Sequence, residues 1–71
     1  MTKQELKREI QALHPKKVRL NIKETAEVIG KHPNRVPEYM RDYPSEKFGN
    51  GRYYFISDIA ERLYEGAQYG H

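Results

Sequence analysis

The sequence predicts a single α+β domain that is mostly helical, with three to four short helices and a two-stranded β-hairpin. Apolar residues recur at helical spacing in three segments, 6–13, 22–29 and 56–63. A Gly-Asn-Gly turn at 49–51 separates two short segments that contain aromatic residues. Seventy-one residues allow one small core, and the absence of cysteine excludes disulfides and thiolate metal ligands.

Residues 1–15 predict an N-terminal amphipathic helix. Thr2 and Glu5 have the spacing of a capping box, and the His14-Pro15 pair ends the helical pattern. The apolar stripe consists of Leu6, Ile10 and Leu13. Because three apolar residues cannot hold an isolated helix in water, we expect this stripe to pack on the rest of the domain. Docking on a partner protein is the alternative.

The next segment, 16–20, alternates basic and apolar residues. This alternation predicts an extended lead-in, with Val18 and Leu20 facing inward and Lys17 and Arg19 facing outward.

Residues 22–42 predict two helices joined by a tight turn. Asn21 and Glu24 have capping-box spacing for a first helix over 22–29, and Gly30 is placed to end it. A second helix is expected to begin near 33–35 and to run to about 42, with Val36, Met40 and Tyr39 facing inward. Pro37 fits if Asn34 is the N-cap or if the helix opens with a 3₁₀ turn. This pattern is typical of a helix-turn-helix, whose second helix enters the major groove of DNA.

A β-hairpin is predicted at 46–55, around the turn at 49–51. We expect Phe48, Tyr53 and Phe55 to face the core, and Lys47, Arg52 and Tyr54 to face outward.

A last helix is predicted from Asp58 to about Glu65. Ser57 is the expected N-cap and Gly66 the expected stop, which leaves 67–71 as a flexible tail.

Positive charge is concentrated in two segments. Residues 1–19 carry six Lys and Arg against two Glu, and residues 31–52 carry five against three acids. Residues 20–30 and 53–71 are net negative, so the total is only +3. This asymmetry favours a nucleic-acid-binding face, although a solvated charged surface is the simpler alternative.

In order and spacing, these features resemble the excisionase-like and MerR-like winged helix-turn-helix domains. The resemblance covers 20–30 with its Glu-Thr-Ala triplet, Val36, the wing 48–55 and the Ser-Asp-Ile segment at 57–59. It implies a winged helix-turn-helix over 16–66. The long coiled coil of full MerR regulators does not follow, so the resemblance implies a small DNA-binding protein of a phage or mobile element.

Three sets of DNA contacts follow from this resemblance and from the chemistry of the side chains. Arg, Asn and Glu match guanine, adenine and cytosine in the major groove, and Lys and Arg neutralise phosphate. The recognition-helix set is Asn34, Arg35, Glu38 and Arg41, the wing set is Lys47, Asn50 and Arg52, and the phosphate set is Lys16, Lys17, Arg19, Lys23 and Lys31.

We therefore expect sequence-specific binding of double-stranded DNA, as an excisionase or a transcriptional regulator in the bacterial cytoplasm. The partners this implies are DNA, further copies of the chain on adjacent sites, and an integrase. A protein-interaction module that docks through the N-terminal helix is the alternative, as is the DNA-recognition part of a terminase small subunit. The three histidines form no metal-ligand motif, and no phosphate-binding glycine loop occurs, so we expect no enzyme activity, metal or cofactor.

Overall fold

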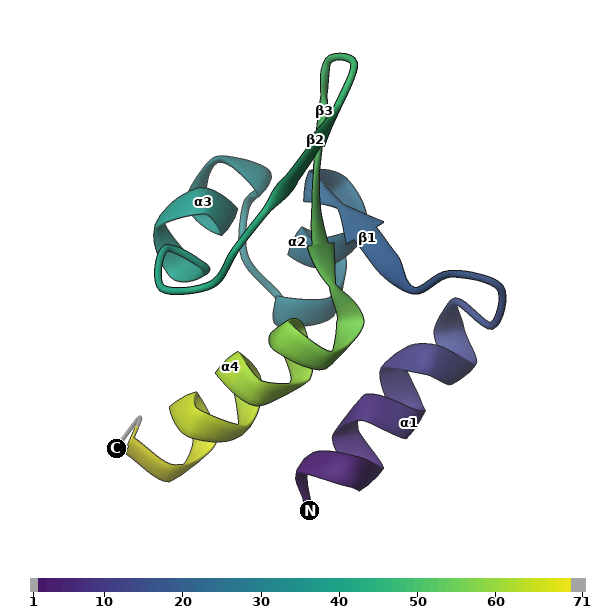
Figure 1. The fold of residues 1–71 in the computed structure, drawn as a ribbon. Coiled ribbons are helices and arrows are strands. Elements are labelled where there is room, and N and C mark those ends of the chain that lie inside the picture. The colour runs from purple at the N-terminus through teal and green to yellow at the C-terminus, as the bar shows by residue number, and fades with distance from the viewer. Residues whose placement is uncertain (1, 70–71) are drawn as a thin grey trace.

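The computed structural model describes the backbone of residues 2–69 and the side chains of residues 2–66. Four α-helices and a three-stranded antiparallel sheet form an α+β fold that is mostly helical, as predicted (Figure 1). The elements in chain order are α1 (Lys3–Leu13), β1 (Arg19–Asn21), α2 (Ile22–Ile29), the 3₁₀ turn η1 (Pro33–Arg35), α3 (Val36–Tyr39), β2 (Glu46–Phe48), β3 (Gly51–Phe55) and α4 (Ile56–Tyr69).

Local capping fixes the ends of α1 and α2. Both predicted capping boxes are present: the Thr2 side chain accepts from the Glu5 N–H, and the Asn21 side chain accepts from the Glu24 N–H at 2.8 Å. Gly30 adopts the left-handed conformation with φ of 72°, and its N–H donates to the carbonyl of Ala26. These three predictions are confirmed, because each depends only on residues close together in the chain.

The segment after Gly30 opens with the 3₁₀ turn, which accommodates Pro37 in the first turn of α3. Of the two expected alternatives, the opening 3₁₀ turn is therefore the one observed. Asn34 is not the N-cap, because the His32 ring caps this turn by accepting from the Asn34 N–H at 3.1 Å. The expected end near residue 42 was wrong. The α3 helix ends at Tyr39, and the chain turns through 40–43 toward β2, with the Tyr43 N–H donating to the Met40 carbonyl.

The sheet has the order β1-β3-β2, so the expected two-stranded hairpin is extended by a third strand, β1. Leu20 pairs with Tyr54, and Lys47 pairs with Arg52. Gly49 supplies the positive φ of the hairpin turn, at 59°, and Gly51 is already part of β3. Residues 19–21 thus form a strand by pairing with β3, whereas 16–18 of the expected lead-in remain outside the sheet.

The faces of the hairpin are opposite to the prediction. Tyr54 is only 2% exposed and packs with Leu20 in the core, whereas Phe48 is 48% exposed. Tyr53 and Phe55 share the outer face with Phe48 and are partly exposed. Side chains alternate along a strand, so a shift of one residue exchanges the two faces. Because residues 53–55 are all aromatic, their sequence does not show which of them face the core.

The core lies between the helices and the inner face of the sheet. In Figure 1, α1 and α4 lie side by side, and Ile10 of α1 is 3% exposed, in one cluster with Ile59 and Ala60 of α4. Leu6 packs against this cluster, but Leu13 is 70% exposed and Val18 is 69% exposed, so the inward prediction was wrong for both. They lie at the two ends of the connection from α1 to β1, beyond the edge of the core.

The last helix begins at Ile56, so Ser57 is not its N-cap, and it continues through Gly66 to Tyr69. The expected stop at Gly66 was wrong, because a glycine ends a helix only where it adopts a positive φ, and Gly66 does not. Residues 67–69 of the expected tail are helical, and 70–71 lie outside the described residues. No helix within residues 2–69 has the length and apolar character needed to cross a membrane.

Candidate nucleic-acid interface

The recognition-helix residues lie together on the exposed side of α3 and its flanking turns. Val36 and Met40 are fully buried on the opposite side, which fixes the orientation of this short segment. Arg35 Nη1 lies 3.8 Å from Glu38 Oε2, in an ion pair whose side chains are almost three-quarters exposed. Such a pair contributes little stability, so both side chains remain available to a ligand. The exposed set is Asn34, Arg35, Glu38 and Arg41.

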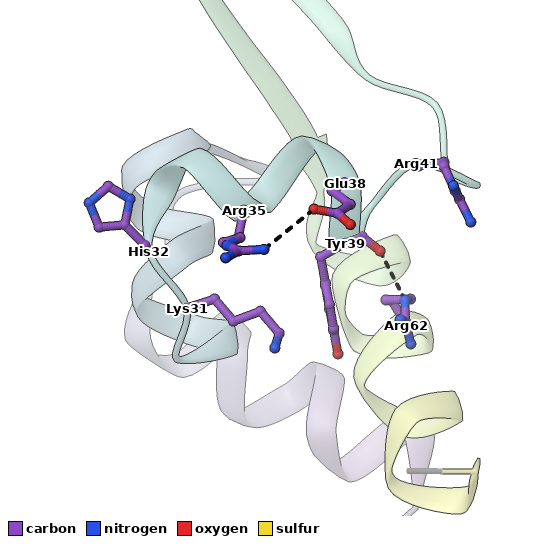
Figure 2. Close-up of a pocket in the computed structure, with 7 residues that line it drawn as sticks. All are labelled: Lys31, His32, Arg35, Glu38, Tyr39, Arg41 and Arg62. Atoms are coloured by element: carbon purple, nitrogen blue, oxygen red, sulfur yellow. Dashed lines mark hydrogen bonds and ion pairs between the residues drawn. The ribbon is translucent and has the colours of Figure 1, made fainter.

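A surface hollow of about 550 Å³ adjoins this side of α3. Figure 2 shows that its lining side chains come from the turn after α2, from η1, from α3 and the turn after it, and from α4. It holds four cationic side chains and one carboxylate. We call it the α3/α4 hollow, and its lining residues are Lys31, His32, Arg35, Glu38, Tyr39, Arg41 and Arg62.

Two cations contact Tyr39 in the α3/α4 hollow. The Arg62 Nε–H donates to the Tyr39 carbonyl at 2.9 Å, and the Arg62 guanidinium carbon lies 4.0 Å from the centre of the Tyr39 ring. The Lys31 ammonium lies 5.3 Å from the same centre, on the opposite side of the ring in Figure 2. Cation–π contacts of this kind hold both cations near the ring, and neither forms an ion pair with a described acidic side chain.

The wing residues lie on the exposed part of the hairpin. Lys47 and Arg52 face each other across β2 and β3, on the same side of the sheet as Leu20 and Tyr54. α2 packs on the strands β1 and β3, and Leu20 and Tyr54 lie in the core, so the two cations extend beyond the core on that side. Asn50 is exposed in the turn.

A second hollow, of about 540 Å³, lies on the other side of the sheet, where β1 begins. We call it the β1 hollow, and Lys16, Lys17, Val18, Arg19 and Tyr53 line it. Two of its three cations are paired with acids. Lys17 donates to the Glu24 carboxylate, and Arg19 Nη1 lies 3.3 Å from Glu46 Oε1. The Arg19 guanidinium also stacks on the Phe48 ring, at 4.5 Å from its centre.

Glu24 contacts three groups beside the β1 hollow. Its carboxylate accepts from Lys17, lies 3.6 Å from His14 Nδ1 and completes the capping box of α2 by accepting from the Asn21 N–H. The hydrogen bond from Lys17 is the main reason that the pKa of Glu24 is lowered, and the Asn21 bond lowers it further. Lys17 is therefore paired with this carboxylate in the folded protein.

The predicted phosphate set is divided between these regions. Lys31 lines the α3/α4 hollow, Lys16, Lys17 and Arg19 line the β1 hollow, and Lys23 is exposed in the first turn of α2. Arg62 and Tyr39 were missed as site residues. The sequence offers one sign of Arg62, because it is the single Lys or Arg within the acidic segment 53–71.

Residues 2–69 contain no group of three His, Cys, Asp or Glu side chains that could bind a metal ion. In comparisons with known proteins, no family model, no curated protein and no solved structure matches this chain.

Proposed function

We propose that the protein binds double-stranded DNA as a winged helix-turn-helix, with α2, the turn and α3 as the helix pair and β2–β3 as the wing. The observation that carries this proposal is the exposed, cationic side of residues 33–41, which comprise η1, α3 and the turn after α3. Because Val36 and Met40 are buried, Arg35, Glu38 and Arg41 face outward, beside a hollow with four cations and one carboxylate. Arg can bind guanine with two hydrogen bonds, and Asn34 can do the same with adenine.

The wing supports the same proposal. Lys47 and Arg52 extend from the same side of the sheet as the core residues Leu20 and Tyr54, so DNA held against α3 would also meet the hairpin. Their contacts would be with phosphate or with the minor groove, and these position the protein on DNA without specifying a sequence.

One small module buries too little surface for high specificity, so several copies on adjacent sites, or a larger partner, are part of this proposal. An excisionase that binds beside an integrase, and a small transcriptional regulator that occludes a promoter, both have this requirement. The DNA-recognition part of a terminase small subunit would use the same surface within a larger assembly.

The test is selection of duplex DNA from a random pool, followed by fluorescence anisotropy against the selected duplex and random DNA. We expect the selected duplex to bind at least about tenfold more tightly. Affinity should fall steeply with salt, with a log–log slope of about −3 or steeper, since several phosphates are contacted. Equal affinity for both DNAs at moderate salt, or a flat salt dependence, would contradict the proposal.

Protein docking through α1 has weaker support. Ile10 is buried against α4 and Leu6 packs on the core, so the three-residue stripe is not available as one surface. Only Leu13 of that stripe is largely exposed, as is Val18 at the other end of the connection from α1 to β1. Binding of a partner through these two apolar side chains would persist at high salt, unlike DNA binding.

A further inference from the structure

We propose that the α3/α4 hollow binds a phosphate group of the DNA backbone, with Arg62 of α4 as its fixed ligand. This inference rests on the proposed function and adds a contact from outside the helix pair and the wing. The ligand chemistry is a phosphodiester, and the contact would set the position of α3 along the groove.

Arg62 is already oriented before any ligand arrives. Its Nε–H is bound to the Tyr39 carbonyl and its guanidinium plane contacts the Tyr39 ring, so one of its five N–H groups is used. The four N–H groups on the terminal nitrogens have the fork geometry that matches phosphate oxygens. Because the side chain is held in place, little rotamer entropy remains to be lost on binding.

The charge balance of the hollow also favours an anion. Within residues 2–69, Lys31, Arg41 and Arg62 form no ion pair, and the single carboxylate, from Glu38, is paired with Arg35. Three cations without acidic partners thus share one concave surface with Tyr39 between two of them (Figure 2). A phosphate group would relieve their mutual repulsion.

Gly66 lies beside this arrangement. A methyl group at Gly66 would lie 3.4 Å from both Arg62 Nη1 and Tyr39 Oη, which is ordinary van der Waals contact. The positions of Arg62 and Tyr39 therefore do not depend on the glycine.

The test compares Arg62→Gln with Arg8→Gln, a matched loss of one arginine charge on α1, outside both hollows. For Arg62→Gln we expect a loss of about tenfold in affinity for the selected and the random duplex alike. The salt slope should become shallower by about 0.9, because one phosphate contact is lost. The ratio of the two affinities should not change, since a phosphate contact carries no sequence information. Arg8→Gln should change neither slope nor ratio.

Arg62→Lys separates a phosphate ligand from a merely structural role. It keeps the charge but loses the Nε–H bond to Tyr39, so its melting temperature should fall while its salt slope stays near that of the wild type. If Arg62→Gln keeps the wild-type slope while duplex binding itself is intact, the inference is overturned and the proposed function stands. If the wild type shows no salt-dependent duplex binding, both fail together.

A second measurement covers the case in which Arg62→Gln does not fold. The NMR signal of the Arg62 Nε–H in the wild-type protein should shift when the selected duplex is added. An unchanged signal at saturating DNA would overturn the inference.

Discussion

The α3/α4 hollow and the β1 hollow are nearly equal in volume, about 550 and 540 Å³, and both are lined by several cations and a tyrosine. They differ in what neutralises the cations. In the β1 hollow, Glu24 and Glu46 pair with Lys17 and Arg19. In the α3/α4 hollow, three of the four Lys and Arg side chains have no acidic partner within residues 2–69. The number of basic residues is thus a poor guide to a DNA-binding surface, because the acids that fold against them decide which charges are free.

The largest expected effect comes from removing two charges from each region in turn. Arg35→Ala with Arg41→Ala should weaken binding of the selected duplex by about a hundredfold, since each arginine can make a two-bonded base contact worth about 1–3 kcal/mol. Lys16→Ala with Lys17→Ala should weaken it by about fivefold or less, because Lys17 is already paired with Glu24. Anisotropy titrations at one salt concentration measure both losses, and the reverse order would overturn the assignment of roles.

A smaller effect is expected when Lys17 is released from its partner. Glu24→Gln keeps a residue that can complete the capping box of α2 but removes the carboxylate that pairs with Lys17 and His14. Affinity for random DNA at low salt should rise by about threefold, because Lys17 is no longer paired and adds to the positive field of the protein.

Glu27→Gln is the matched control for this change, since Glu27 is an exposed acid on the same helix and forms no ion pair within residues 2–69. Equal responses of the two variants would mean that the Glu24 pairing does not mask Lys17.

The smallest expected effect is on the pH dependence of stability. The Lys17 hydrogen bond holds the pKa of Glu24 below its usual value of 4.5 in the folded protein, so folding favours the carboxylate. The resulting stability is complete above the pKa of the unfolded chain and is lost as pH falls through the lower pKa of the folded state. The melting temperature of the wild type should therefore drop more between pH 6 and pH 3 than that of Glu24→Gln, by about 4 °C.

Asp58 acts in the opposite direction, because burial raises its pKa, but it does so equally in both proteins. The difference between the two melting curves therefore isolates Glu24. Curves that fall in parallel would show that its pairing with Lys17 contributes no stability.

The parts of the fold that the sequence predicted are those fixed by neighbours in the chain. The Asn21–Glu24 capping box, the turn at Gly30 and the position of the hairpin all depend on residues within a few positions of one another. The errors concern choices that tertiary packing makes. Phe48 and Tyr54 exchanged faces because only the core determines the phase of the strands, and Gly66 did not end α4 because its φ stayed negative.

The candidate site likewise combines features fixed by nearby residues with features fixed by tertiary packing. Arg35, Glu38 and Arg41 could be placed on an exposed helical face from their spacing relative to Val36 and Met40. Arg62 could not, because the hydrogen bond that brings it to Tyr39 spans 23 positions. Likewise, the pairing of Arg19 with Glu46 spans 27 positions, so the neutralisation of the β1 hollow was not visible in the sequence.

The most direct test of the central claim is an NMR titration of the wild-type protein with the selected duplex, which compares the two hollows in one experiment. We predict large backbone shifts at 31–41, smaller ones at 47–52, and a shift of the Arg62 side-chain signal, while 16–19 and Tyr53 change little. Larger shifts at 16–19 and Tyr53 than at 31–41 would contradict the account, because they would place the DNA on the surface whose cations are already paired.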